Sequence, residues 1–277
     1  MLKRILLLLG ETAASQTARA IAFRLTRDTG AALAGLAGID RTALAMPSLG
    51  RAGTGALKVR LEQDLRVQAE DLRQRLHACH EAECAAQGIP FECLAFEGEP
   101  LAALQVAAET RDLVVAGHDT GFHGGDEVPL PDLLARLLAR TPRPFLVCGD
   151  DPPEGEDVVV GYDASIPAMR ALQLFALTGL GQGRRVKVVC VDQSQEEATR
   201  RAGGAVSYLA SHGLVVEAVP VISRAAPSEA LRLEVANLKA GLLVMGSYGH
   251  AGWRDLLFGS TTRKLAENPP CPLFVYH

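Results

Sequence analysis

The stretch that decides the fold is Leu242-Leu-Val-Met-Gly-Ser-Tyr-Gly249, followed after nine residues by Gly259-Ser-Thr261. The first part predicts an apolar strand ending in a glycine turn, and the second predicts a glycine turn that opens a helix. Ligands gather at the carboxyl ends of parallel strands, glycines let the backbone approach a phosphate, and the amides at a helix start attract anions. Two isolated glycine turns are more simply explained as tight turns and a helix C-cap, but the full spacing favours a phosphate site.

Working outward, the sequence repeats itself. Strand-like segments recur in the same order in two copies: Ile5–Gly10 with Asp157–Gly161, Arg111–Gly117 with Ala240–Gly246, and Thr141–Cys148 with Pro269–Tyr276. Between the copies, residues 149–156 are charged and rich in Pro and Gly, which disfavours both helix and central strand. We therefore expect two domains, residues 1–149 and 157–277.

Each copy alternates short apolar runs with longer amphipathic stretches, the pattern of a mostly parallel sheet with helices on both faces. We count five strands per copy. Those of the second copy are expected near Val158–Gly161, Val186–Val191, Val215–Val219, Leu242–Gly246 and Pro272–Tyr276. In the first copy, a long helix is expected from about Leu57 to Gln87, after a loop at Ala43–Gly55 that is rich in Gly, Pro and Ser.

Composition narrows the class of protein. The 277 residues carry 28 Lys and Arg against 32 Asp and Glu, a net charge of −4, without the basic patch that nucleic acid requires. Six cysteines at irregular spacings form no CxxC pair, as is typical of cytosolic thiols. Lys3-Arg4 and the apolar run after it imitate a secretion signal, but the same segment recurs mid-chain and is expected to be a strand. We predict a cytoplasmic protein with neither nucleic acid nor membrane as a partner.

The spacing Gly-x2-Gly-x9-Gly-Ser resembles the nucleotide-binding signature of the universal stress protein family, and Pro272–Tyr276 resembles that family's closing strand. The resemblance implies an α/β fold of two tandem Rossmann-like domains, of the adenine nucleotide alpha hydrolase-like type. Each domain would be a five-stranded parallel sheet of order 3-2-1-4-5 with helices on both faces. It also implies an adenine nucleotide as ligand, with ATP expected and Mg²⁺ as its counter-ion.

The resemblance also assigns roles to residues of the second copy. It implies that Asp163 accepts hydrogen bonds from the ribose hydroxyls, although an Asp after a strand is also a common helix cap. The remaining expected contacts are Val191 and Met245 beside the adenine, Gly161, Tyr162 and Ser165 lining the pocket, Gly246 and Gly249 near the ribose and phosphates, Gly259, Ser260 and Thr261 at the outer phosphates, and His250 as a further contact.

The first copy departs from this pattern. Thr12 is aligned with Asp163, and Pro131-Asp132 is aligned with Gly259-Ser260. A proline lacks the amide donor, and an aspartate would repel a phosphate. We expect this degenerate domain to be a structural or regulatory partner that does not bind nucleotide in the same way.

Two groups of residues have metal-ligand chemistry. His77, His80 and Cys84 share one face of the long helix, and His118, Asp119, His123 and Asp126 share a loop. We do not expect either group to bind a metal. Metal sites usually draw ligands from more than one element, whereas each of these groups lies within one.

No Walker-type GxxxxGK[ST] or Gly-x-Ser-x-Gly elbow is present, so dedicated catalysis is not expected beyond slow ATP hydrolysis. The leading hypothesis is an ATP-binding stress-response protein whose nucleotide switches its conformation or its binding of an unidentified protein partner. The alternative is a nucleotide-independent interaction module. The closing strands, Phe145–Cys148 and Leu273–Tyr276, are expected to pair as an intrachain pseudo-dimer. Whether two chains then form a homodimer is left open.

Overall fold

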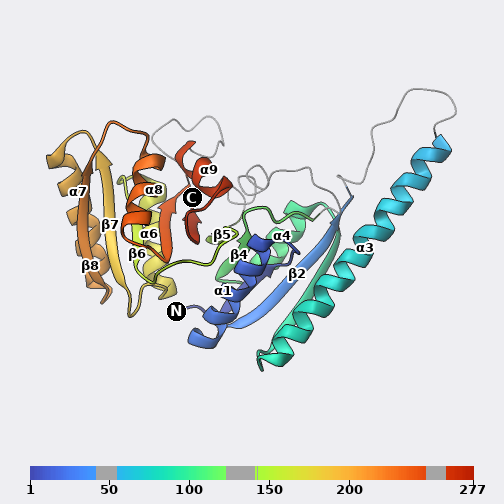
Figure 1. Ribbon diagram of the computed structural model, residues 1–277. Helices are drawn as coiled ribbons and strands as arrows, with labels where there is room; N and C mark the ends of the chain where they lie inside the picture. Colours follow the sequence, from blue (N-terminus) through green and yellow to red (C-terminus); the bar gives the residue numbers. More distant parts are fainter. Residues whose placement is uncertain (42–54, 123–140, 142, 248–259) are drawn as a thin grey trace.

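A computed structural model describes residues 1–41, 55–122, 141, 143–247 and 260–277, with side chains from residue 59 onward in the helix that begins at residue 55. The described strands form one twisted sheet of ten strands in the order β3-β2-β1-β4-β5-β10-β9-β6-β7-β8 (Figure 1). The strands are β1 (Arg4–Leu8), β2 (Ala32–Asp40), β3 (Phe91–Gly98), β4 (Leu113–Gly117), β5 (Phe145–Cys148), β6 (Val158–Gly161), β7 (Arg185–Asp192), β8 (Val215–Ile222), β9 (Leu242–Gly246) and β10 (Leu273–Tyr276).

The sheet consists of two halves with the same topology. The first half reads β3-β2-β1-β4-β5 and the second reads β8-β7-β6-β9-β10, which is the order 3-2-1-4-5 in both, with parallel pairing throughout each half. The halves meet where β10 pairs antiparallel with β5, and Phe274 lies opposite Leu146. The predicted fold class, strand order and pairing of the closing strands are therefore confirmed.

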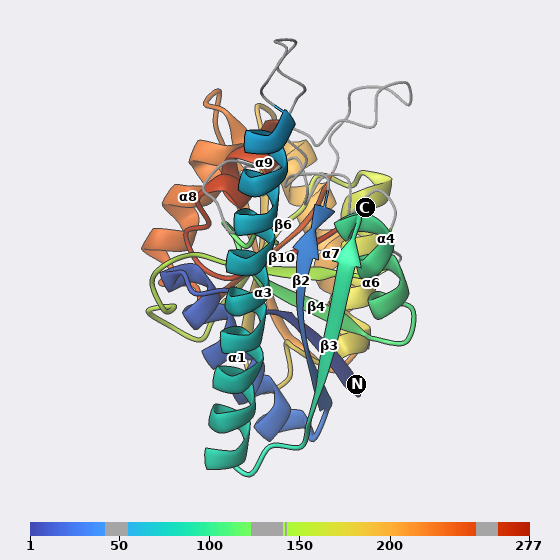
Figure 2. The same ribbon diagram turned by 90° about the vertical axis from the view of Figure 1, so that its right-hand side faces the viewer.

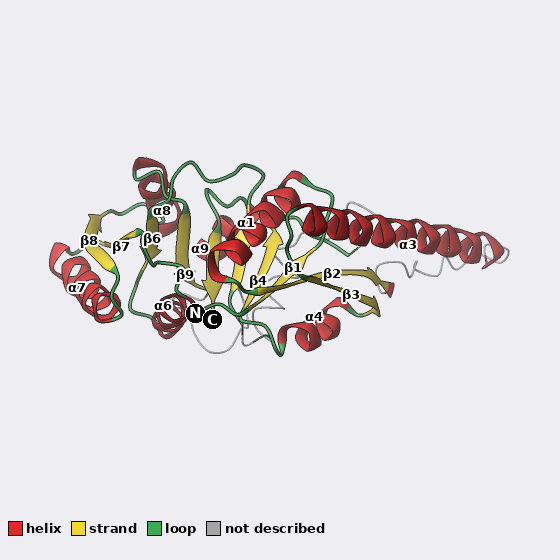
Figure 3. Cartoon of the chain, turned by 90° about the horizontal axis from the view of Figure 1, so that it is seen from below, coloured by secondary structure: helices red, strands yellow, loops and turns green. Residues whose placement is uncertain are grey.

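Helices cover both faces of the sheet (Figure 3). They are α1 (Ala13–Thr29), α3 (Gly55–Ala86), α4 (Pro100–Ala108), α6 (Ile166–Thr178), α7 (Gln195–Ser211), α8 (Pro227–Asn237) and α9 (Ser260–Glu267). Side chains of α1, α3, α6 and α7, such as Phe23 and Phe175, join the core on one face. Side chains of α4, α8 and α9, such as Leu104, Leu231 and Leu265, join the core on the other. The apolar runs of the strands are buried because both faces are covered.

The helix predicted from Leu57 to Gln87 is observed as α3, which runs beside β2 and then extends past the end of the sheet (Figures 1 and 2). Its C-terminal part buries Leu76, His80 and Cys84, whereas Val59 near its start is 63% exposed. The loop expected at 43–55 falls on residues 42–54, outside the described residues. None of the described helices is long and apolar enough to cross a membrane.

Two glycines at corresponding strand ends allow a helix to begin close to the sheet. A Cβ added to Gly117 would lie 2.7 Å from the backbone nitrogen of Ser15 in α1, and a Cβ added to Gly246 would lie 2.5 Å from that of Ala168 in α6. The obstructing atoms belong to the backbone, so no side-chain rotation relieves either contact. Only glycine fits these two positions without moving a helix.

Gly117→Ala should therefore lower the free energy of unfolding by about 1–3 kcal/mol, as overpacking does elsewhere. Gly203→Ala is the matched control, because Gly203 lies in α7 with open space around its Cβ position. There the alanine should raise stability by roughly 0.5–1 kcal/mol through helix propensity. Urea denaturation of both variants measures the difference, and a neutral Gly117→Ala would contradict the close helix approach.

Candidate functional site

The expected nucleotide-binding residues from Gly161 to Gly246 lie at the carboxyl ends of β6, β7 and β9. These strands are neighbours, because β6 pairs with β7 on one side and with β9 on the other. The chain leaves β6 at Gly161 and enters α6 at Ile166, directly beside the end of β9. The structure thus brings together the turn after β6, the end of β7 and the start of the glycine motif at one edge of the sheet.

The turn between β6 and α6 is held by four hydrogen bonds. The Tyr162 amide donates to the carbonyl oxygen of Val189 at 3.0 Å, and the Cys190 thiol donates to the Tyr162 carbonyl at 2.9 Å. Asp163 Oδ1 accepts from the Ser165 amide at 2.9 Å, while Ser165 Oγ accepts from the Ala168 amide at 3.3 Å. The helix cap is therefore Ser165. Asp163, for which a capping role was the alternative, is therefore not the N-cap of α6.

The backbone of this turn is unusual at Ala164, whose φ is 62°. A left-handed conformation is uncommon for an alanine, and such positions cluster where a structure presents functional groups. Burial also raises the pKa of the half-buried Tyr162 hydroxyl, so this side chain stays neutral at physiological pH. The turn offers one carboxylate, from Asp163, beside neutral groups.

Contacts from both sides converge on Gly246 at the end of β9. Its Cα lies against Pro167 and Ala168 in the first turn of α6. On its other side, Thr262 Oγ1 of α9 donates to the Gly246 carbonyl oxygen at 3.1 Å. Gly246 is therefore needed for packing, whatever it does toward a ligand.

The remaining site residues are placed as follows. Met245 is buried in the core beneath this edge, and Val191 is partly buried against the same core. Ser260 is exposed at the first position of α9, and Thr261 follows it, half-buried. Gly249, His250 and Gly259 lie outside the described residues, as do Pro131 and Asp132.

Sequence reasoning missed Ser247, which follows Gly246 directly. Its side chain is fully buried, and its Oγ has no hydrogen-bond partner among the described residues. Its backbone amide donates to the Tyr276 carbonyl oxygen at 2.7 Å, which ties the glycine motif to the closing strand. A polar residue between two motif glycines is a signal that could have identified it.

The first half corrects one alignment made from sequence. Leu9 and Tyr162 make the same amide bond to the neighbouring strand, and Thr12 and Ser165 are both helix N-caps. Thr12 therefore corresponds to Ser165, and the counterpart of Asp163 is Gly10. The error arose because the apolar run of the first copy continues to Leu9, one residue past the end of β1, so counting from the run misplaces the turn.

In the first half, the chain's own side chains bridge the ends of β1 and β4. Thr12 Oγ1 donates to Asp119 Oδ1 at 2.8 Å, and Ser15 Oγ lies 3.3 Å from Thr120 Oγ1. Asp119 and Thr120 follow β4, and Thr12 and Ser15 open α1. This half therefore has no carboxylate at the position of Asp163 and places a threonine–aspartate link across the same edge.

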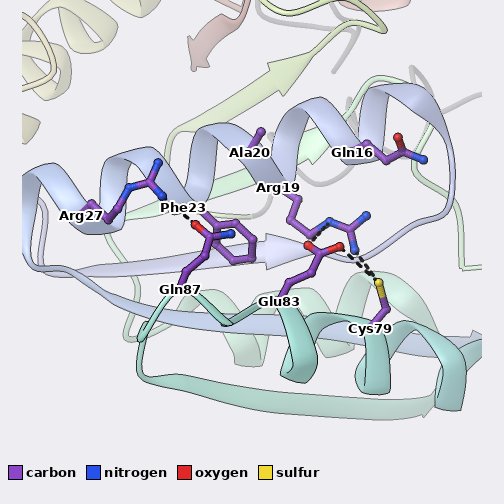
Figure 4. Close-up of a pocket in the computed structure, with 8 residues that line it drawn as sticks. All are labelled: Gln16, Arg19, Ala20, Phe23, Arg27, Cys79, Glu83 and Gln87. Atoms are coloured by element: carbon purple, nitrogen blue, oxygen red, sulfur yellow. Dashed lines mark hydrogen bonds and ion pairs between the residues drawn. The ribbon is translucent and has the colours of Figure 1, made fainter. Parts of the chain in front are cut away.

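A groove of about 630 Å³ lies away from the strand ends, between α1 and α3 (Figure 4). Arg19 crosses it, with Nε 3.1 Å from Glu83 Oε2 and Nη1 3.2 Å from Cys79 Sγ. Farther along, Arg27 Nη1 donates to Gln87 Oε1 at 2.7 Å. These contacts are made between helix side chains, so the groove is not part of the expected nucleotide site.

The helical group His77, His80 and Cys84 does not form a metal-ligand set. His77 Nε2 lies 3.0 Å from the Leu94 carbonyl oxygen, whereas His80 is buried between Phe23 and Phe91. Burial raises the pKa of Cys84 to about 11. The set that does bring ligand atoms together among the described residues is His118, Asp119 and Asp150. The other expected members of that loop, His123 and Asp126, lie outside them.

The buried imidazole should make stability depend on pH. Burial, assisted by the positive charge of Arg19, lowers the pKa of His80 from 6.5 to about 4. Below pH 6.5 the His80 imidazole of the unfolded chain binds a proton that the folded chain excludes. The contribution of neutral His80 to the free energy of unfolding is therefore complete above pH 6.5 and is lost as the pH falls toward 4. At about 1.4 kcal/mol per pKa unit, the loss is on the order of 3 kcal/mol.

Urea denaturation at several pH values across that window tests this expectation. His80→Phe keeps an aromatic ring between Phe23 and Phe91 and removes the titrating group. As the pH falls, the free energy of unfolding of this variant should therefore decrease less than that of the unaltered chain. Identical pH dependence in both proteins would show that His80 does not titrate in this range.

The amino-acid sequence is similar to those of universal stress proteins. Residues 156–277 match the model of the universal stress protein family. The universal stress protein Slr1230 of Synechocystis is 26% identical over 145 residues, 52% of this chain and 50% of that protein, so the chain spans about half of that relative. A universal stress protein of Thermus aquaticus is 25% identical over 131 residues, 43% of this chain and 96% of its own.

Similarity in structure extends over the whole chain. The crystal structure of a universal stress protein from Archaeoglobus fulgidus covers 99% of this chain and 97% of its own, with a TM-score of 0.63 and 17% identity. Fold and topology thus define a tandem Rossmann-like α/β protein. The family model matches residues 156–277, so the second half of the chain is the part that is similar to the universal stress protein family.

Proposed function

We propose that the second domain, residues 157–277, binds ATP at the carboxyl ends of β6, β7 and β9 and acts as a nucleotide-dependent stress-response switch. The observation that carries this proposal is the convergence on Gly246. One of its faces touches the first turn of α6, and its carbonyl oxygen accepts a hydrogen bond from Thr262 of α9. The turn holding Asp163 and the helix opened by Ser260 therefore flank a single strand end.

Each residue type suits its proposed role. The Asp163 carboxylate can accept hydrogen bonds from two ribose hydroxyls. The amides at the start of α9, with the Ser260 and Thr261 hydroxyls, suit phosphate oxygens. Val191 and Met245 supply apolar surface for the adenine. The hydroxyl and carboxylate oxygens also suit a hard cation such as Mg²⁺, which would neutralise phosphate charge.

The first domain, residues 1–149, would serve as a structural or regulatory partner. Gly10 supplies no carboxylate for a ribose, and Thr12 bonds to Asp119 across the corresponding edge. One nucleotide per chain follows from this asymmetry. Nucleotide occupancy would then change the conformation of the second domain or its association with a protein partner.

The proposed function does not include dedicated catalysis. The described residues near Gly246 include no nucleophile paired with a base, so any ATP hydrolysis would be slow. A cytoplasmic location is part of the proposal, because all six cysteines are free thiols. The second candidate function is a nucleotide-independent interaction module. It is favoured by the packing of Gly246 against α6, because this packing requires a glycine whether or not a ligand binds.

Calorimetric titration with MgATP and with GTP tests the proposal, after the purified chain has been freed of carried-over nucleotide. We expect one saturable ATP site per chain and weaker binding of GTP. Asp163→Ala and Gly259→Asp should each reduce ATP affinity at least tenfold, through the lost ribose contact and through repulsion of the phosphates.

Asp157→Ala is the matched control, because Asp157 precedes β6 at the opposite end of the same strand and pairs there with Arg185. It should bind ATP as the unaltered chain does. If no ATP binds, or if Asp163→Ala binds it unchanged, the assigned pocket is wrong and the interaction module takes its place.

A further inference from the structure

A second set of ligand-type side chains lies in the first domain, at the carboxyl ends of β4 and β5. His118 and Asp119 follow β4, and Asp150 follows β5. One nitrogen or oxygen atom from each of these three side chains lies within 4.8 Å of the other two. The ligands come from two separate loops, as is usual for metal sites and unlike the helical group around His80.

The backbone carrying these side chains is fixed by bonds to its surroundings. The His118 amide donates to the Cys148 carbonyl oxygen at 2.8 Å, which joins the two loops at their start. Thr17 Oγ1 of α1 donates to the Asp150 carbonyl oxygen, also at 2.8 Å. Thr12 Oγ1 donates to Asp119 Oδ1 and so orients the Asp119 carboxylate. The backbone at His118 and Asp150 and the side chain of Asp119 are therefore held on adjacent strand ends before any ion arrives, which reduces the entropy lost on binding.

The pair His118 and Asp150 has the spacing of two metal ligands rather than that of a hydrogen bond. His118 Nε2 and Asp150 Oδ1 are 3.5 Å apart, beyond the roughly 2.7–3.2 Å of a good N–H···O bond. Two ligand atoms bound tetrahedrally to zinc at about 2.0–2.1 Å lie about 3.3–3.4 Å from each other. The His118 side chain is 23% exposed and that of Asp150 is 63% exposed, so solvent can reach the remaining coordination positions.

We propose that His118, Asp119 and Asp150 bind a divalent first-row transition-metal ion, of which Zn²⁺ is the representative. One imidazole nitrogen and two carboxylate oxygens suit such an ion, whereas Mg²⁺ and Ca²⁺ prefer oxygen-only shells. Two carboxylates also balance the charge of the ion when the imidazole is neutral. The site is independent of the proposed nucleotide site, because it uses strand ends of the other half of the sheet.

The test is a Zn²⁺ titration of the full chain after removal of metals by a chelator, with a competing chromophoric chelator to measure affinity. We expect one tightly bound Zn²⁺ per chain. His118→Gln and Asp150→Asn should each weaken binding at least tenfold, because each removes one of three protein ligands. Zn²⁺ should also raise the thermal unfolding midpoint of the unaltered chain and not that of either variant.

Two control variants separate this site from other zinc-binding groups. His77→Gln and Cys79→Ser remove a partly exposed imidazole and an exposed thiol on α3, and both should bind Zn²⁺ as the unaltered chain does. Loss of binding in either control, normal binding in both site variants, or no stoichiometric Zn²⁺ at all would overturn the proposal. MgATP binding by His118→Gln should be unchanged, so failure here is distinguishable from failure of the nucleotide site.

Discussion

The antiparallel pairing of β5 with β10 is the contact on which the rest of the molecule depends. Each half ends in a four-residue strand that is mostly buried, and alone each would expose an apolar edge. Their pairing leaves β3 and β8 as the edge strands of the ten-stranded sheet. Those edges carry Glu92 and Glu97 on β3 and Glu217 and Pro220 on β8, residues that discourage further strand addition.

This pairing also determines how the two candidate sites are related. Because β5 and β10 run in opposite directions, the carboxyl end of β5 lies near the amino-terminal end of β10, where Pro269 O faces Gly149. Asp150 therefore projects from the junction at the end of β10 that is distant from Gly246. One repeated fold thus presents two different sets of functional groups, and a ligand at one set need not compete with a ligand at the other.

The predictions from sequence succeeded where a periodic pattern carries the signal. Apolar runs located the five strands of the second half to within three residues at each end, and the amphipathic stretch located α3. They failed at the turn after β1, where Thr12 was matched to Asp163. A turn of a few residues has no period, and its register is set by which residue caps the helix. That choice depends on hydrogen bonds such as those of Thr12 and Ser165, which spacing alone does not reveal.

The sequence by itself determined the fold class, the duplication, the order of elements and the residue types gathered at the ends of β6 and β9, because each follows from local periodicity or from a spaced motif. Only the tertiary structure decided that Gly246 is held between α6 and α9, that Ser247 is buried beside it, and that Asp150 joins His118. These residues are brought together by strands that are neighbours in the sheet and distant in the chain. Their contacts therefore depend on strand order and register rather than on sequence separation.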